Sequence, residues 1–530
     1  MFRISALSFL SATVSFAAVH RVPADHPTIQ AGLDFASAGD TVLVADGTYR
    51  GDGNRDLDFR GKDLVLRSEF GRDVTEIDCE GTADDPHRGF YLHSGESLAA
   101  RIEGFTITGG YVLPVDEKPF GGGIWLDHAS ATVIDCVIRN CEAQLGGAIM
   151  AFAGDQEIFL DLIGCDLVEN FASTYGGAVY FGLCSAKIED CRFENNRALN
   201  RAGGLYLSTF TNMDMRDSVI RDNAAEAAEG GGIFSYRADV DLERCVIAGN
   251  EALQGGGVEF RGKPGEESPL LSMTNCLISD NSATVDGGGI DAFRGAEISA
   301  RFTTVTGNSA AHGAGIACGE SAEVAFSNSI VRGNEAGNEI SADDSSRLSS
   351  SYSNMGDGWS GEGNIDLDPR FVAGGNGDYL LSEDSPCIDA ANPEDPTDRD
   401  LEGDERPQGR GYDMGADEFV PACDLNVVLS DYPESLRPNE VLAFRADAEN
   451  SCDGDLGLNE AIMSVTGPAA LERSLYEGAM IIIESGVRVG ASVTLRVPPR
   501  APLGVYGVEV TIYRDGEIID SGAFEVEIRD

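Results

Sequence analysis

The chain has 530 residues, 42% of them hydrophobic, which is enough to bury a large core and to form more than one domain. Its 89 acidic residues outnumber its 38 Lys and Arg residues and give a formal net charge of -51. Such a surface repels nucleic acid, anionic lipid and polyuronate, so these partners are disfavoured. The acidic residues are dispersed, which favours a role in solubility and in blocking strand-edge association over recognition by charge.

Residues 1-18 have the pattern of a secretory signal peptide. Arg3 gives a charged start, Ile4 to Ala18 is a short apolar run, and the run ends in small residues. It is shorter than the roughly 20 residues that cross a bilayer, and the sequence holds no second candidate. We therefore expect an exported chain with no transmembrane segment in its mature form, placed in the extracellular space, at the bacterial cell surface or at the outer membrane.

The segment after this pattern predicts a helix followed by a strand. Ile29, Leu33 and Ala36 lie on one face of the expected helix, and the strand ends near Tyr49. An unpaired end of a repeat protein exposes strand edges and apolar interior, so the helix is expected to cover the open end of a solenoid.

A glycine signature repeats eight times between Gly121 and Ile316, at intervals of 25 to 32 residues. In each copy two or three small residues precede an aliphatic residue, and the copies begin at Gly121, Gly146, Gly176, Ala202, Gly230, Gly255, Gly287 and Gly313. Self-similarity at this period indicates a stacked solenoid. The repeats hold short β-type runs without an apolar stripe at helical spacing. With two or three strands per turn, each strand can pair only with its counterpart in the next turn, which predicts a parallel β-helix.

A second signature, apolar-x-x-Cys-x-aliphatic-x-x-Asn-x-Ala, predicts which side chains stack in the interior. The expected apolar ladder is Val133, Leu162, Ile188, Met215, Leu242 and Met273, and the expected ladder of small residues is Cys136, Cys165, Cys191, Ser218, Cys245 and Cys276. An asparagine ladder follows at Asn170, Asn196, Asn223, Asn250, Asn281, Asn308 and Asn334. We expect these asparagines to tolerate left-handed turns and to bond from coil to coil, rather than to bind sugar.

The 12 cysteines of an exported chain would ordinarily suggest a disulfide framework. Five of them occupy the ladder of small residues, which favours buried fillers over disulfide partners. Cys423 and Cys452, near the C-terminus, are the best candidates for a disulfide. No Cys-x-x-Cys pattern or histidine-rich cluster supports a zinc site.

An acidic segment after the repeats is a candidate calcium site. Asp398, Asp400, Glu402 and Asp404 alternate with other residues around a glycine, as the carboxylates of a calcium loop do. Position 409 is Gly409, so the bidentate glutamate of an EF-hand is missing. Neighbouring arginines could neutralise the carboxylates without a metal, and a solvated acidic loop is the alternative interpretation.

Three groups of motifs resemble known families. Ile29 to Tyr49 resembles the opening of pectin-lyase-like right-handed β-helix proteins, and Gly146 to Ile149 with Phe193 to Asn196 resembles the polymorphic outer membrane protein repeat. Residues 364-371, 377-379, 385-390 and 411-418 resemble the end of bacterial choice-of-anchor Q domain proteins. Members of that group often carry a separate surface anchor. This sequence ends in Glu525 to Asp530 without a hydrophobic tail or sorting motif, which puts attachment to the cell in doubt.

The sequence therefore predicts three parts. They are the signal peptide at residues 1-18, a right-handed parallel β-helix with an N-terminal cap and a choice-of-anchor Q-like end at 19-420, and a β-sandwich at 421-530. In the last part the glycine pairs vanish and alternating strands appear, such as Tyr506 to Tyr513, which suggests an immunoglobulin-like sandwich. The fold class is all-β, a solenoid followed by a small immunoglobulin-like β-sandwich.

The motifs favour binding over catalysis. Some β-helix enzymes cleave acidic polysaccharides, but a lyase needs an Arg or Lys base beside calcium-binding carboxylates, and no coil brings these together. A polygalacturonase-like hydrolase would need motifs of which only Asp84-Asp85, Asp343-Asp344 and Ala311-His312-Gly313 have a partial counterpart. We expect a monomeric, non-catalytic, adhesin-like protein that binds a polysaccharide or a cell-surface protein, and no nucleic acid. A polysaccharide lyase or hydrolase of the pectin-lyase-like fold is the alternative.

Overall fold

The computed structural model describes residues 17-113, 118-154, 156-335, 337-373, 379-420 and 425-529, the last range without 439, 451-455, 467-470, 484-487, 498-501 and 515-516. The signal-peptide pattern, apart from its last two residues, and both Cys423 and Cys452 lie outside the described residues. The chain divides into one unit that runs to Arg406 and includes Tyr412–Glu418, and a second formed by Pro407–Gly411 and Phe419–Asp530. Within the described residues no helix is long and apolar enough to cross a membrane.

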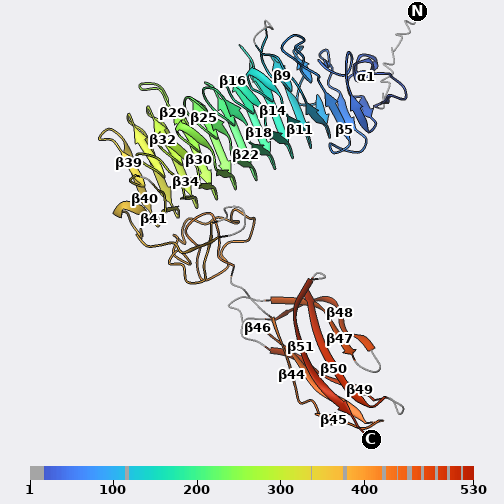
Figure 1. Ribbon diagram of the computed structural model, residues 1–530. Coiled ribbons are helices and arrows are strands. Elements are labelled where there is room, and N and C mark those ends of the chain that lie inside the picture. Colours follow the sequence, from blue (N-terminus) through green and yellow to red (C-terminus); the bar gives the residue numbers. More distant parts are fainter. Residues whose placement is uncertain are drawn as a thin grey trace, which may run out of the picture. The chain divides into compact units, whose positions relative to one another are not determined.

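The first unit is a solenoid of parallel strands, in which each strand pairs with its counterparts in the coils before and after it (Figure 1). Among the described residues, sheet A contains β1 (Val19–Val22), β2 (Thr41–Val44), β4 (Val65–Ser68), β7 (Arg101–Glu103), β10 (Ala131–Ile134), β14 (Ile158–Ile163), β18 (Cys184–Glu189), β22 (Asn212–Arg216), β26 (Asp239–Glu243), β30 (Leu270–Thr274), β34 (Glu297–Arg301), β37 (Glu323–Ser327) and β40 (Arg347–Ser351). Sheet B contains β3 (Gly47–Tyr49), β5 (Thr75–Asp78), β8 (Thr106–Thr108), β11 (Val137–Arg139), β15 (Asp166–Val168), β19 (Arg192–Glu194), β23 (Val219–Arg221), β27 (Val246–Ala248), β31 (Leu277–Ser279), β35 (Thr304–Thr306), β38 (Ile330–Val331) and β41 (Asn354–Met355).

Two further parallel sheets complete the coils. Sheet C contains β6 (Phe90–Leu92), β9 (Ile124–Asp127), β13 (Ile149–Phe152), β17 (Val179–Gly182), β21 (Leu205–Leu207), β25 (Ile233–Tyr236), β29 (Val258–Arg261), β33 (Ile290–Phe293), β36 (Ile316–Gly319) and β39 (Ile340–Ala342). Sheet D contains β12 (Glu142–Leu145), β16 (Phe171–Tyr175), β20 (Arg197–Ala198), β24 (Ala224–Ala225), β28 (Glu251–Gln254) and β32 (Ser282–Asp286).

The middle coils therefore carry four strands, where the sequence predicted two or three. The unexpected strands are those of sheet D, which are short and bury a single alanine each, such as Ala143, Ala172 and Ala198. One small buried residue between polar neighbours gives little of the apolar alternation by which a strand is recognised. The sequence pattern therefore does not predict sheet D.

The predicted apolar ladder and the ladder of small residues are both present. Strand pairing places Val133 beside Leu162, Leu162 beside Ile188, and so on through Met273, and all six side chains are buried. The five ladder cysteines are buried and carry no disulfide. Burial raises the pKa of Cys245 well above its ordinary value, which keeps this thiol protonated. These cysteines fill the turn between sheets A and B.

The asparagine ladder is also present, as a continuous chain of hydrogen bonds. Asn223 donates from its backbone N and from Nδ2 to Oδ1 of Asn250, at 3.0 and 2.9 Å, and Asn250 donates in the same way to Asn281. The Nδ2 of Asn250 also reaches the carbonyl of Ile220 in the coil before. One expectation was wrong: the left-handed conformation belongs to the residue before each asparagine, such as Asp222 at φ 55, and not to the asparagine itself.

The glycine signature combines two requirements. The first small residue of each copy is left-handed, as at Gly176 (φ 69) and even at Ala202 (φ 59). The second has an ordinary φ but lies against the next coil, so a Cβ at Gly177 would stand 2.2 Å from the carbonyl oxygen of Gly203. Close backbone approach, and not a left-handed conformation, therefore requires glycine at Gly177.

Both ends of the first unit differ from the repeats. Helix α1 (Ile29–Phe35) packs beside β1 and β2, and it buries Ile29 and Leu33 in the core of the solenoid, as the predicted cap should. After the last coil come a short 3-10 helix, η1 (Gly356–Gly358), and an antiparallel pair, β42 (Phe371–Ala373) and β43 (Tyr379–Leu381). Residues 385-418, which we call the terminal segment, contain no strand among their described positions.

The second unit contains two sheets with a common core. Within its described residues, one sheet comprises β44 (Leu425–Ser430), β46 (Val441–Asn450) and β49 (Arg488–Arg496). The other comprises β45 (Ser435–Leu436), β47 (Leu456–Thr466), β48 (Leu471–Ile483), β50 (Gly504–Arg514) and β51 (Glu517–Ile528). Phe444 and Val493 from the first sheet pack with Met463 and Val508 from the second, so this unit is a small β-sandwich.

Candidate functional site

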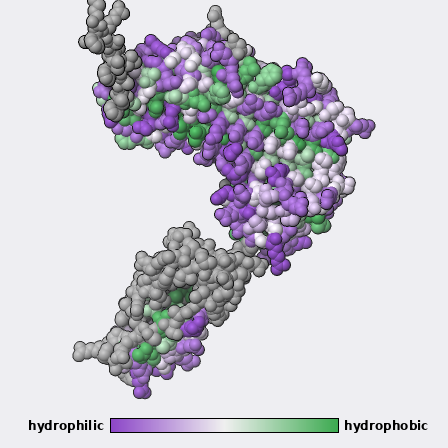
Figure 2. Space-filling model, turned by 180° about the vertical axis from the view of Figure 1, so that it is seen from behind, coloured by the Kyte–Doolittle hydropathy of each residue, from purple (hydrophilic) through white to green (hydrophobic). Residues whose placement is uncertain are grey.

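A groove of about 820 Å³ runs across the outer face of sheet A. It crosses five consecutive strands, from β14 to β30. Its lining comprises Phe159, Asp161, Ser185, Ala186, Lys187, Asn212, Met213, Asp214, Asp239, Val240, Asp241, Glu267, Ser268, Leu270 and Ser272. The groove is an extended, open depression. On the face of the first unit that Figure 2 shows, hydrophilic residues predominate.

Alternation along the strands explains the groove. Residues such as Leu162 and Met215 face the core, so their neighbours Asp161 and Asp214 face outward. Parallel register then sets Asp161, Lys187, Asp214, Asp241 and Ser272 side by side in one row across the face. Adjacent members stand about 4.8 Å apart, which is the spacing between paired strands.

A second row lies two residues earlier on the same strands. It consists of Phe159, Ser185, Asn212, Asp239 and Leu270, and it begins and ends with exposed apolar side chains. Phe159 is 41% exposed and Leu270 is 40% exposed. Apolar surface at both ends with hydroxyl, amide and carboxylate groups between them can bind a ligand that has both apolar faces and hydroxyl groups.

The groove is acidic, with one cation in it. Lys187 pairs with Glu189 at 3.1 Å, and both side chains are about half exposed. Burial raises the pKa of Asp161, against an opposing effect of Lys187. Asp161, Asp214, Asp239, Asp241 and Glu267 therefore present acceptors for hydroxyl or ammonium donors, and they repel a polyanion.

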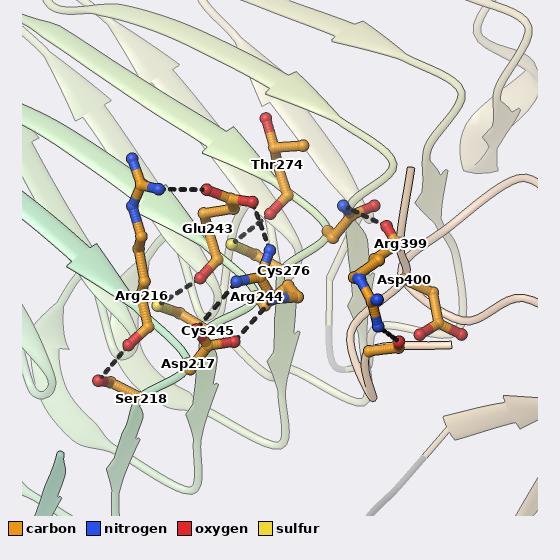
Figure 3. Close-up of polar contacts among 12 residues, drawn as sticks. Arg216, Asp217, Ser218, Glu243, Arg244, Cys245, Thr274, Cys276, Arg399 and Asp400 are labelled. Carbon is orange, nitrogen blue, oxygen red and sulfur yellow. Dashed lines mark hydrogen bonds and ion pairs between the residues drawn. The ribbon is translucent and has the colours of Figure 1, made fainter. Parts of the chain in front are cut away.

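An ion-pair network borders the groove where the strands of sheet A end (Figure 3). Arg244 donates from Nε and Nη2 to the two carboxylate oxygens of Asp217, at 2.6 and 2.9 Å, and it also contacts Glu243. Glu243 in turn lies 3.4 Å from Arg216. The hydrogen bond to Asp217 is the main cause that raises the pKa of Arg244. This network fixes the side chains along the turn between sheets A and B.

The predicted calcium residues are only partly brought together. Asp400 and Glu402 lie with Asp417, and one ligand atom from each of these three falls within 4.8 Å of the others. Asp398 and Asp404 are not in this group; Asp404 instead donates its backbone N–H to Asp400 Oδ1 at 2.7 Å. Sequence reasoning missed Asp417, although it belongs to the motif Gly411 to Glu418. Burial raises the pKa of Asp417 to about 6, so ionisation of this carboxyl group costs more than usual and a nearby cation would favour it.

Buried charge holds the terminal segment in place. Arg406 has a fully buried side chain that lies 3.4 Å from Glu418 and donates to the carbonyls of Asp413, Gly415 and Ala416. Its guanidinium also stands 4.9 Å from the ring centre of Phe302 in the solenoid. Burial lowers the pKa of Arg406, and the carboxylates oppose that shift. From the sequence, Arg406 was only one of the neighbouring arginines that could neutralise the acidic segment.

Sheet C carries a different row, which is structural. In register it runs Tyr91, Trp125, Met150, Tyr180, Tyr206, Phe234, Glu259 and Asp291. The rings of Tyr180, Tyr206 and Phe234 stack with centres 4.8 and 5.1 Å apart. Tyr206 and Phe234 are buried, so their faces are occupied by one another and not by a ligand.

The same row ends in two buried carboxyl groups. Glu259 is fully buried beside Arg261. Its Oε2 atom has no hydrogen-bond partner among the described residues. Burial raises the pKa of Glu259 well above its ordinary value and that of Asp291 to about 6. The pair is coupled, so the two carboxyl groups titrate together, with protonation favoured in the folded state.

The residues considered for catalysis in the sequence have separate contact partners and do not contact one another in the contacts described below. His312 is exposed and lies 3.1 Å from Asp286. Asp85 pairs with Arg55 and His87, and Asp343 accepts hydrogen bonds from Glu320 and Ser345. The bonds to Asp343 lower its pKa, so this carboxyl group is not suited to act as an acid.

Comparison with solved structures finds similarities that cover only about a fifth of this chain. The chain is similar to the alkylpurine DNA glycosylase AlkC of Pseudomonas fluorescens (14% identity, TM-score 0.17, 21% of this chain and 31% of that chain). It is similar to the sporulation control protein Spo0M of Bacillus subtilis (10% identity, TM-score 0.17, 20% and 49%) and to a CARDB domain from Pyrococcus furiosus (10% identity, TM-score 0.15, 20% and 87%). The chain thus spans less than half the length of AlkC or Spo0M.

No curated protein matches the sequence. Residues 82–355, which are more than half of the chain, match the family described as the right handed beta helix region. The match covers the coils in which the ladders and the sheet A groove lie. The chain belongs to the family of right-handed β-helix proteins.

Proposed function

We propose that the protein is an exported, adhesin-like binding protein whose sheet A groove holds an extended carbohydrate chain. The observation that carries this proposal is the groove itself, with in-register rows of polar side chains and exposed apolar groups at both ends. Sugar rings combine apolar faces with many hydroxyl groups, and a row of carboxylates, amides and hydroxyls at strand spacing matches a repeating ligand. The signal-peptide pattern and the resemblance to polymorphic outer membrane protein and choice-of-anchor Q proteins support a place outside the cell or on its surface.

Charge narrows the ligand class. The chain carries a net charge of -51, and the groove contains five carboxylates against Lys187. A polyuronate or sulfated polymer would meet repulsion along the whole groove, whereas a neutral or amino-bearing polysaccharide would not. We propose a neutral or cationic polysaccharide as the partner, bound by a monomer of this chain.

The test is co-sedimentation and affinity electrophoresis of the full chain with a panel of neutral, amino-bearing and acidic polysaccharides. Asp214→Ala and Asp241→Ala should each weaken binding about tenfold, because each removes a charge-assisted hydrogen bond from the centre of the row. Asp344→Ala, which removes an exposed acidic residue from a different loop, is the matched control. Binding that is unchanged in both groove variants, or that occurs only with acidic polymers, would overturn the proposal.

One observation favours the alternative, a polysaccharide hydrolase. Asp161 has a raised pKa, and Asp214 lies two strands away in the same row, at about 10 Å between Cα atoms by strand spacing. Two carboxyl groups about 6.5 to 9.5 Å apart, one of them with a raised pKa, are the arrangement of an inverting glycosidase. Lys187 stands between them in the row, and its charge lowers the pKa of Asp161, which opposes a role as general acid, so binding is the better supported function.

The same panel separates the two. New reducing ends or unsaturated products released by wild-type protein, and abolished in Asp161→Asn, would establish catalysis. Polysaccharide that is bound and recovered intact would establish binding alone.

A further inference from the structure

A polar notch of about 390 Å³ lies where the solenoid meets the terminal segment. Glu243, Arg244 and Asn275 line it from the turns between sheets A and B, and residues 396-399 line it from the terminal segment. Figure 3 shows Arg399 across from Arg244, which follows β26, and Thr274, the last residue of β30. The notch is separate from the sheet A groove, with which it shares no lining residue.

Asn275 gives the notch an unmet hydrogen-bonding need. The residue is 1% exposed, and its Nδ2 donates to Thr397 Oγ1 at 3.1 Å and to the carbonyl of Arg399 at 2.7 Å. Its Oδ1 is buried and has no partner among the described residues. Leaving a buried acceptor without a donor is costly, so a donor bound in the notch would recover stability.

The other groups in the notch include both acceptors and donors. The carboxylate of Asp398 is exposed and has no hydrogen-bond or ion-pair partner in the described part of the chain. Arg244 uses three of the five N–H groups that an arginine carries, and Arg399 uses one, to the carbonyl of Gly403. Two carboxylates, Glu243 and Asp398, balance the two guanidinium groups, so the rim is neutral overall.

These observations restrict the chemistry of a ligand. A free cation would satisfy Asn275 Oδ1 but would be repelled by Arg244 and Arg399. An anion would pair with the arginines but would face Asp398 and Glu243, and it brings no donor for Asn275. A neutral molecule with several hydroxyl groups can donate to Oδ1 and to the carboxylate while accepting from the guanidinium groups. A volume of about 390 Å³ holds a ligand of the size of one or two sugar rings.

We propose that the notch binds a single neutral saccharide unit. Hydroxyl groups of the sugar donate to Asn275 Oδ1 and to the Asp398 carboxylate, and the arginines donate to its oxygens. The inference goes beyond the polysaccharide groove, since it names a second site with its own residues and a ligand of one ring.

The test is saturation-transfer NMR on the full chain with D-glucose, D-galactose, D-mannose and N-acetyl-D-glucosamine. At least one sugar should receive saturation, and Asp398→Ala should weaken its binding at least about tenfold, because a charge-assisted hydrogen bond is lost. Asp398 makes no side-chain bond within the described protein, so the variant should keep the thermal unfolding of the wild type. Asp344→Ala is the control for the loss of one exposed charge.

Each other outcome overturns the proposal in a distinguishable way. If no sugar of the panel receives saturation, the notch holds only water. If Asp398→Ala binds as the wild type does, the sugar lies elsewhere. If Asp214→Ala, in the groove, removes the signal, the single ring occupies the groove. The chain could fail to bind polysaccharide and still give a single-sugar signal that depends on Asp398. That result would reject the proposed function of the groove and support the proposed site in the notch.

Discussion

The repeats and the terminal segment are stabilised in opposite ways. In the repeats each contact recurs, so that Asn223, Asn250 and Asn281 make the same bonds one coil after another. In the terminal segment each contact occurs once, and Arg406 alone bonds three carbonyls and a carboxylate. A stacked repeat distributes its stability over many small, equal terms, whereas an irregular segment concentrates it in a few buried charges. The predictions below vary one side of this comparison at a time.

The largest effect is expected from a side chain between two coils. Gly177→Val would place its Cβ 2.2 Å from the carbonyl oxygen of Gly203, where both coils are fixed by backbone pairing. We expect a loss of at least about 4 kcal/mol in the free energy of unfolding, measured by urea denaturation. Gly164→Ala is the control, since Gly164 has φ 62 but nothing within 4 Å of its Cβ position, and it should lose only about 1 kcal/mol. Equal losses would show that backbone conformation, and not close approach, sets the sensitivity.

Removing the buried charge of the terminal segment should come next. Arg406→Met removes the guanidinium beside the buried carboxylate of Glu418, and the expected loss is about 3 to 5 kcal/mol. Arg406→Met combined with Glu418→Gln should recover part of this loss, because the unpaired charge is gone. Urea unfolding followed by hydrogen exchange of residues 385-418 measures both. A single variant that is as stable as the wild type would contradict the role given to this pair.

Breaking the asparagine ladder should have a smaller effect. Asn250→Ala removes the acceptor for two donors of Asn223 and leaves the carbonyl of Ile220 without its donor. We expect a loss of about 2 to 3 kcal/mol in unfolding free energy. Asn200→Ala, at an exposed position, should stay within about 0.5 kcal/mol of the wild type. A ladder variant no less stable than Asn200→Ala would show that the ladder contributes nothing.

The buried carboxyl pair of sheet C predicts a pH dependence. Because the pKa of Glu259 is raised and that of Asp291 is about 6, the folded state binds more protons than the unfolded state between about pH 4 and 6. The contribution of the pair to stability is therefore complete below pH 4 and is lost as the pH rises through the folded pKa values. Glu259→Gln should gain stability relative to the wild type on going from pH 4.5 to pH 8, measured by urea denaturation. A difference that is the same at both pH values would refute this.

Calcium should give the smallest effect, in the terminal segment. If an ion binds Asp400, Glu402 and Asp417, millimolar calcium should raise the melting temperature by a few degrees at pH 7.5 through mass action. Asp417→Asn should abolish the rise. Asp398→Asn, which alters a carboxyl group outside this group of three, should retain it. A melting curve that ignores both calcium and chelator would leave the segment held by its arginines alone.

The repeats could be predicted from sequence because every coil restates the same information. The glycine copies and the ladders through Val133, Cys165 and Asn250 each recur, so one alignment of the chain with itself fixes both period and inward positions. Sheet D could not be predicted, since alanine between polar neighbours is a weak signal for a strand. The left-handed conformation was predicted one position too late. Asparagine tolerates this conformation, but here each ladder asparagine directly follows the left-handed residue.

The candidate sites could be predicted less well. The groove depends on outward residues, such as Lys187 and Asp214, that do not repeat and that give no signal until register sets them side by side. The cluster of three carboxylates brings Asp400 together with Asp417, which lies 17 positions later in irregular chain, and no periodicity links the two. The notch depends on Asn275, which lies between β30 and β31, whereas the ladder asparagine of the same coil, Asn281, follows β31. The sequence gives no signal that separates these two asparagines in function.

Hydrogen exchange of the full chain, with and without a polysaccharide that binds it, tests the central claim most directly. The account predicts added protection in β14, β18, β22, β26 and β30, the strands that form the groove, and none in the strands of sheet C. Added protection confined to sheet C or to the second unit, with a ligand that demonstrably binds, would contradict it.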